Sequence, residues 1–186
     1  MSRQAGLALT ALRGETCEAH ERLDALFGRF DLRLERDYRG FLTAHAMALP
    51  PLEAATGVAG MGQELDDWDQ RKRTQALTAD LRALGAGLPS PLEIAPLSDT
   101  DEAWGTAYVL EGSRLGGAYL ARQIGDGLPN SYLGTPQAPG AWRKFLETLE
   151  ERLYSADRAA RAGAAAARAF ALFERAGREM LERTAE

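Results

Sequence analysis

The sequence predicts an all-α protein folded as a helical bundle. Strong helix formers (alanine, leucine, arginine and glutamate) are abundant, and runs of β-branched residues are absent. Hydrophobic residues make up 45% of the 186 residues, which indicates a folded chain rather than a disordered one. This length suits one sizeable core, and neither a repeat nor a linker is visible, so we expect residues 1–186 to form a single domain of the bundle type.

Helical periodicity and helix-breaking residues place the elements along the chain. The Pro50–Pro51 pair should kink or interrupt the second helix. Glycine- and proline-rich segments 87–100 and 125–140 indicate loops. Asp99 followed by Glu102 resembles a capping box at the start of the fourth helix, with aspartate in place of serine or threonine. We therefore expect helices over 3–27, 35–60, 63–86, 101–125, 139–154 and 158–184.

Charge and hydropathy narrow the possible partners and compartment. The net charge of −5 argues against non-specific nucleic-acid binding. No apolar run is long enough to span a membrane, and residues 1–15 lack the apolar segment of a signal peptide. A single cysteine, Cys17, excludes an intramolecular disulfide and fits a reducing compartment. We expect a cytoplasmic monomer with no nucleic-acid or membrane partner.

The first predicted helix carries a histidine on an apolar stripe. The stripe comprises Leu12, Thr16, His20, Leu23 and Phe27. Arg13 precedes His20 by nearly two turns, so both side chains project from similar sides about 10 Å apart. This pair suits a ligand with a metal at one end and a carboxylate at the other, and Asp24 is placed to orient the imidazole. The alternative is that His20 is a hydrogen-bonded core residue.

His45 and Cys17 offer weaker alternatives for a metal site. His45 shares a stripe with Tyr38, Phe41 and Leu49, and we expect it to be buried; it is the alternative metal ligand if His20 is not. Cys17 and His20 have the spacing of a metal-binding pair, but no second cysteine or nearby histidine completes it. The sequence lacks the paired Glu-x-x-His of di-iron bundles, a nucleophile elbow and a P-loop.

The segment YVLEGSRLGGAYLA, residues 108–121, places three glycines inside a predicted helix. Each interior glycine costs a helix about 1 kcal/mol relative to alanine. Two explanations stay open for Gly112, Gly116 and Gly117. Either they let another helix pack closely, or they leave a bare backbone against a flat ligand, with Tyr108 and Ser113 as the nearby polar groups.

Three segments in this order, LRGETCEAHERLD, DYRGFLTAHAMALPPLE and AYVLEGSRLGGAYLARQI, resemble the heme oxygenase family. The chain is most similar to the compact bacterial enzymes that produce biliverdin, and the resemblance covers nearly its whole length. It implies an all-helical fold in which heme lies between a proximal helix, which bears the iron-ligating histidine, and a glycine-rich distal helix.

The resemblance also implies roles for individual residues. His20 matches the proximal iron ligand, and Arg13 matches the basic residue that pairs with a heme propionate. The distal glycines match Gly112, Gly116 and Gly117, and Gly112 and Gly116 with Ser113 form the implied catalytic wall.

Further positions match the family more loosely. Arg143 falls near a second propionate-binding basic residue, and Phe173 falls near an aromatic pocket position. Many members have an aspartate where this chain has Ser113, which leaves the route of proton delivery open. Ala107 replaces a propionate-binding tyrosine of some members, so Tyr108 is the neighbouring candidate.

The implied activity uses heme b as cofactor and substrate. With O2 and an external electron donor of the ferredoxin or reductase type, heme is cleaved to biliverdin, CO and ferrous iron. Biliverdin would serve a bacterial phytochrome, or the reaction would release iron. The basic run 71–73 is either a dock for an acidic redox partner or a solvated charge run.

Two other functions stay open at this point. Ser113 in place of the aspartate motivates a heme or tetrapyrrole carrier or sensor without turnover. A thiaminase-like hydrolase on a related helical fold would need Cys17 as its nucleophile.

Overall fold

The computed structural model describes residues 6–185, and these contain helices but no strand. The expected all-α fold is confirmed. The helices are α1 (Leu7–Phe27), α2 (Glu35–Val58), α3 (Met61–Glu64), α4 (Trp68–Arg71), α5 (Thr74–Ala83), α6 (Thr100–Leu120), α7 (Ala141–Arg152) and α8 (Ala156–Ala185), with a 3₁₀ turn η1 (Ala121–Gln123) after α6. Residues 3–5 of the first predicted helix lie outside the described residues. None of the helices in the described part of the chain is long and apolar enough to cross a membrane.

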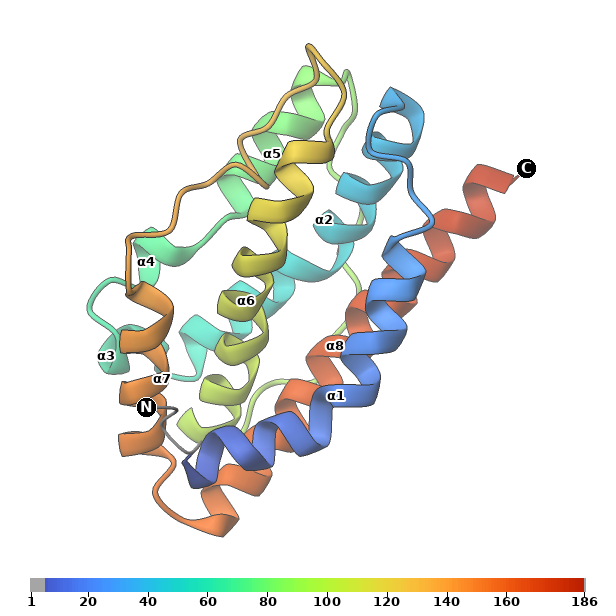
Figure 1. Ribbon diagram of the computed structural model, residues 1–186. Helices are drawn as coiled ribbons and strands as arrows, with labels where there is room; N and C mark the ends of the chain where they lie inside the picture. The colour runs from blue at the N-terminus through green and yellow to red at the C-terminus, as the bar shows by residue number, and fades with distance from the viewer. Residues whose placement is uncertain (1–5, 186) are drawn as a thin grey trace.

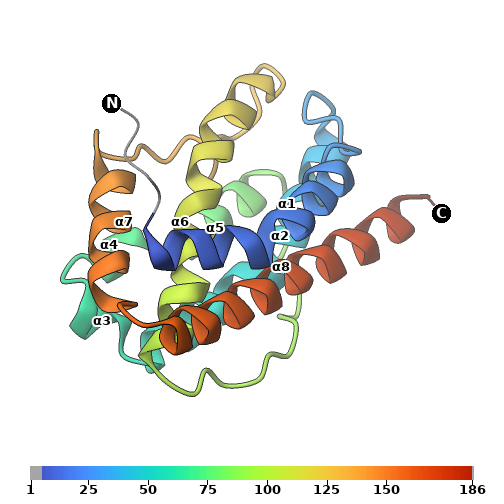
Figure 2. The ribbon, with the colours of Figure 1, turned by 60° about the horizontal axis from the view of Figure 1, so that its bottom comes forward.

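The long helix α8 is the element around which the others pack. It contacts α1, α2 and α6, and α1 runs beside it over much of its length (Figures 1 and 2). Its inner face is built of small buried side chains, which let neighbouring helices approach closely. These are Ala159, Ala162, Ala165, Ala166, Ala169 and Ala176.

The closest approach between α6 and α8 is at Gly105. A Cβ atom added to Gly105 would lie 1.9 Å from the backbone oxygen of Ala162, so only glycine fits this crossing. The neighbouring Trp104 packs against Phe145 of α7 with the ring centroids 5.4 Å apart, and both side chains are fully buried. These contacts anchor the first half of α6 in the core.

The Pro50–Pro51 pair does not interrupt α2, contrary to one of the two expected outcomes. Pro51 cannot donate the hydrogen bond that the carbonyl of Met47 would accept in a regular helix. The amide of Leu92, in the loop after α5, donates to this carbonyl instead, at 2.8 Å. The loop therefore satisfies the group that the proline leaves free, and the helix continues to Val58.

The prediction of one helix over 63–86 was wrong, because the chain forms three short helices, α3, α4 and α5, in this region. The break before α5 is set by Glu53 of α2, whose carboxylate accepts hydrogen bonds from the amides of Arg73 and Thr74, at 2.6 and 3.2 Å, and from the Thr74 hydroxyl at 2.7 Å. A side chain from another helix thus satisfies the free amides at the start of α5.

The start of α6 follows the expected capping pattern with one change. The Asp99 carboxylate accepts from the amide of Glu102 at 3.0 Å, as predicted. The Glu102 carboxylate reaches back to the amide of Ser98 instead of Asp99, at 2.9 Å. The two segments predicted as loops are 87–100 and 125–140. Neither contains a helix, except that Thr100, the last residue of the first segment, is the first residue of α6.

Replacing Gly105 by alanine should destabilise the protein by at least about 2 kcal/mol, because the new methyl group meets a backbone oxygen that cannot move without shifting α8. Gly14→Ala is the matched control: Gly14 also lies inside a helix but has open space around it, so alanine should stabilise by about 0.5–1 kcal/mol. Urea unfolding measures both. Equal effects of the two substitutions would contradict the close crossing.

Candidate functional site

A cavity of about 570 Å³ lies between α1, α2, α6 and α8. Its volume is that of a site for a cofactor-sized molecule. Aromatic, aliphatic and glycine residues form most of its surface. The lining residues are His20, Leu23, Asp24, Phe27, Gly28, Phe41, His45, Val109, Gly112, Ser113, Leu115, Gly116, Gly117, Tyr119, Leu120, Tyr132, Phe170 and Phe173.

The α1 side of the cavity presents the imidazole of His20. Its Nδ1 lies 3.1 Å from the Oδ2 of Asp24, one turn later on the same helix. Its ring lies 5.8 Å from that of Phe170. With the Nδ1 proton donated to the carboxylate, the Nε2 lone pair is left to act as a ligand. His20 is 63% exposed, so it is not the core residue of the alternative interpretation.

The α6 side presents backbone instead of side chains. A Cβ atom added to Gly116 would meet nothing within 4 Å, and one added to Gly112 or Gly117 would make ordinary contacts at 3.5 Å or more. These glycines therefore do not serve close helix packing, and they leave bare backbone at the cavity. The close-packing glycine of α6 is Gly105, which the sequence did not single out.

Large apolar side chains of α6 are exposed at the rim of this cavity. Leu115 is 50% exposed and Tyr119 is 67% exposed. Both line the cavity. A flat apolar ligand seated there would cover surface that is otherwise in contact with water.

His45 of α2 lies at the inner end of the cavity among aromatic rings. The ring centroids of Phe41 and Phe27 lie 4.2 and 4.7 Å away, and those of Tyr132 and Phe173 lie at 5.5 and 5.6 Å. Its Nδ1 is 2.9 Å from the carbonyl oxygen of Phe41. Since a carbonyl only accepts, Nδ1 carries the proton and Nε2 is an acceptor. Burial lowers the pKa of His45 to about 4, so the ring is neutral near pH 7.

The buried carboxylate of Asp80 positions Tyr132 in the cavity wall. It accepts hydrogen bonds from the amides of Ser131 and Tyr132, at 2.9 and 2.8 Å. The hydroxyl of Tyr38 donates to the carbonyl of Pro129 in the same loop, at 2.9 Å. Two helices thus hold the loop after η1 against the cavity.

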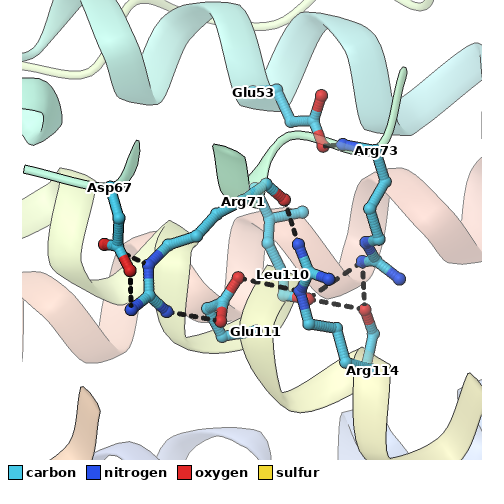
Figure 3. A network of polar contacts seen from close by, with 8 residues as sticks. Glu53, Asp67, Arg71, Arg73, Leu110, Glu111 and Arg114 are labelled. Atoms are coloured by element: carbon cyan, nitrogen blue, oxygen red, sulfur yellow. Dashed lines mark hydrogen bonds and ion pairs between the residues drawn. The ribbon is translucent and has the colours of Figure 1, made fainter. Parts of the chain in front are cut away.

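A buried polar network lies behind the α6 wall (Figure 3). The Glu111 carboxylate accepts from Nη1 of Arg71 at 2.7 Å and from Nε of Arg114 at 3.0 Å. Arg114 also donates to the carbonyl of Arg71. Arg71 is bound in addition by Asp67, at 2.7 and 2.8 Å.

Arg73, two residues after Arg71, contacts a residue of the cavity lining. Its Nη2 donates to the hydroxyl of Ser113 at 2.6 Å and to the carbonyl of Leu110 at 2.9 Å. Ser113 donates its hydroxyl hydrogen to the same carbonyl, at 2.7 Å. A serine has one such hydrogen, so Ser113 can offer the cavity a lone pair but no proton.

Comparison with known proteins identifies the family. No family model matches the chain. The chain is 36% identical over 132 residues to the heme oxygenase of Xanthomonas campestris pv. campestris, a match that spans 62% of this chain and 79% of that protein. The chain belongs to the heme oxygenase family. The family resemblance expected from the sequence is confirmed.

Two further relatives agree with this membership of the heme oxygenase family. The heme oxygenase PigA of Pseudomonas aeruginosa is 29% identical over 181 residues, which cover 91% of this chain and 88% of PigA. The NO- and CO-bound heme oxygenase of Neisseria meningitidis matches with a TM-score of 0.82 over 95% of this chain and 92% of that chain. At 24% sequence identity, this last likeness shows that the fold is shared.

In this heme oxygenase family member, most but not all of the predicted site residues meet at the cavity. His20, Ser113, Phe173 and the three distal glycines line it. Arg13, Tyr108 and Arg143 do not. Arg13 lies close enough to the Tyr108 phenol to act on its pKa, which burial raises, and the Tyr108 ring lies 5.7 Å from that of Trp142. Exposed Arg143 lies on α7 beside Gly140.

One expectation about charged groups is corrected. The basic run 71–73 is not a solvated charge run, because Arg71 is largely buried and Arg73 is 4% exposed. Cys17 is exposed, and residues 6–185 contain no group of three or more histidine, cysteine or acidic side chains that could hold a metal ion.

Sequence reasoning missed the residues that support the cavity from behind. Asp80, Arg73 and Glu111 each lie in a segment whose local pattern is that of an ordinary charged helix face. Asp80 binds amides 51 and 52 residues away along the chain, Arg73 binds Ser113 40 residues away, and Glu111 binds Arg71 40 residues away. A long-range contact of this kind leaves no periodic signal in one sequence.

Protonation of the unfolded chain should destabilise the protein below pH 6.5. His45 has a pKa of 6.5 when exposed and about 4 when folded, so the unfolded state alone takes up this proton between these values. The free energy of unfolding should fall by up to about 3 kcal/mol over that range from this residue. Urea titrations of wild type and His45→Gln between pH 7 and 4 measure the difference. Parallel pH dependences of the two proteins would contradict a neutral imidazole in the folded protein.

Proposed function

We propose that the protein is a heme oxygenase that binds heme b in this cavity as cofactor and substrate. The observation that carries the proposal is an imidazole with a free Nε2 on one side of the cavity and a glycine helix face on the other. With O2 and an external electron donor, the proposed products are biliverdin, CO and ferrous iron.

The residues present fit heme in size, shape and donor chemistry. The cavity volume suits the macrocycle, and the rim residues Leu115 and Tyr119 would be covered by it. His20 supplies one neutral nitrogen ligand, which Asp24 holds in place. When bound, heme supplies the redox-active iron on which O2 is activated.

The α6 side of the cavity, which would be the distal side of bound heme, contributes mainly through the absence of side chains at its glycines. The exposed backbone at Gly112 and Gly116 leaves room beside the ring for a small diatomic molecule. The Ser113 hydrogen is committed to Leu110, so protons reach this side through water that Ser113 accepts from. Neutral His45 is a second acceptor for such water, through its Nε2.

We propose Arg13 as the propionate partner. It lies on α1, two turns before His20, and a guanidinium recognises a carboxylate with paired hydrogen bonds. Its closeness to the Tyr108 phenol supports a joint role of these two side chains at the cavity edge.

We further propose the reaction partners. This protein would act as a cytoplasmic monomer. A separate ferredoxin- or reductase-type protein would supply its electrons. Biliverdin would pass to a bacterial phytochrome, or the reaction would serve the release of iron.

A heme or tetrapyrrole carrier is the second candidate, and the Ser113 hydroxyl favours it, because its hydrogen is donated to the Leu110 carbonyl and is not available to the cavity. Degradation of the bound heme distinguishes a heme oxygenase from a heme carrier. Heme-loaded protein supplied with reductant and air should lose the heme band and gain that of biliverdin; heme that stays intact would support the carrier instead.

His20→Ala should change the Soret band of the bound heme and weaken binding by at least about tenfold, or 1.4 kcal/mol, because the iron loses its protein ligand. Titration of heme into wild type and variant, followed by absorbance, measures both effects. Cys17→Ala is the control on the same helix and should match wild type; it also tests the hydrolase alternative. Identical spectra for wild type and His20→Ala would exclude His20 as the ligand.

Gly116→Leu should leave the fold intact and weaken heme binding by at least about tenfold, because its side chain enters the open cavity. Gly14→Leu places the same side chain in open space on the outside of α1 and should bind heme normally. Circular dichroism checks the fold, and heme titration checks the affinity. Unchanged affinity in Gly116→Leu would place the ligand elsewhere.

A further inference from the structure

Arg73 holds a positive charge behind the wall of the cavity. The side chain is 4% exposed, and its Nη2 contacts two neutral groups, the Ser113 hydroxyl and the Leu110 carbonyl. Its guanidinium carbon lies 5.1 Å from the centroid of the Tyr132 ring. Within residues 6–185 no ion pair joins Arg73 to a carboxylate, which is unusual for a buried guanidinium.

The nearby carboxylates are bound by other donors. Glu53 accepts from the amides of Arg73 and Thr74 and from the Thr74 hydroxyl, so its charge faces the N-terminus of α5. Figure 3 shows the Arg73 side chain running away from Glu53 towards Leu110. Glu111 is held by Arg71 and Arg114. The Arg73 guanidinium therefore contacts the cavity lining directly, whereas Glu53 and Glu111 are held by other donors.

Three cavity residues are in reach of this charge. Ser113 and Tyr132 contact the guanidinium directly, and both line the cavity. The same guanidinium contributes to the lowered pKa of His45, after the larger effect of burial. Because Arg73 is buried, its fixed charge acts over several ångströms and needs no reorganisation when a ligand arrives.

We propose that Arg73 makes the distal side of the cavity selective for anions, and so favours negative charge on a small ligand held there. It is a positioning residue that acts through space and through Ser113, without touching heme. This inference rests on the proposed function and goes beyond it, because it assigns the electrostatic character of the distal pocket to a residue outside the cavity lining.

The test compares an anionic with a neutral ligand on the heme-loaded ferric protein. Azide and imidazole are titrated into wild type, Arg73→Gln and Arg73→Met, and binding is followed in the Soret region. Both substitutions should weaken azide at least about tenfold, or 1.4 kcal/mol, and change imidazole affinity less than about twofold. A merely structural role of Arg73 would weaken both ligands alike.

Two further variants complete the design. Arg73→Lys keeps the charge and should retain azide affinity near that of wild type. Lys72→Gln removes the neighbouring charge, which pairs with Asp69 at the surface, and should change neither ligand. Equal losses for azide and imidazole, or no loss of azide affinity, would overturn the inference. Absence of heme binding by wild type would instead reject the proposed function, so the two failures are distinguishable.

Discussion

The rotation of α6 about its own axis is the constraint on which the site depends. Two buried contacts to Arg71 fix it on the side of the helix away from the cavity: the Glu111 carboxylate accepts from the Arg71 guanidinium, and Arg114 donates to the Arg71 carbonyl. With Glu111 held there, the adjoining Gly112 and, one turn on, Gly116 face the open space. A rotation of α6 by one residue would replace this bare face with side chains.

A buried ion network is a costly way to hold a helix, since desolvation offsets much of the attraction between the charges. Apolar packing alone would leave α6 poorly fixed in this half, because its glycines have no side chains to interlock with neighbours. The first half of the helix uses Gly105 and Trp104 for packing against α8 and α7. The second half is held by the contacts of Glu111 and Arg114 with Arg71, and the same basic segment places the Arg73 guanidinium behind the cavity wall.

Features set by neighbouring residues were predictable from the sequence, and those set by distant contacts were not. The stripe of His20 with Asp24 one turn later, and the run of glycines in α6, are local patterns, and both reach the cavity as expected. The break before α5 depends on Glu53, which lies 20 residues earlier. The roles of glycines could not be told apart either: Gly105 and Gly116 look alike in sequence, and only the position of α8 separates them.

The central claim is that heme lies between His20 and the glycine face of α6. A crystal structure of the heme-loaded protein tests it most directly. It should show the Nε2 of His20 bound to iron, and the backbone at Gly112 and Gly116 against the opposite face of the ring. Iron bound by His45, or a ring seated away from the α6 glycines, would contradict it.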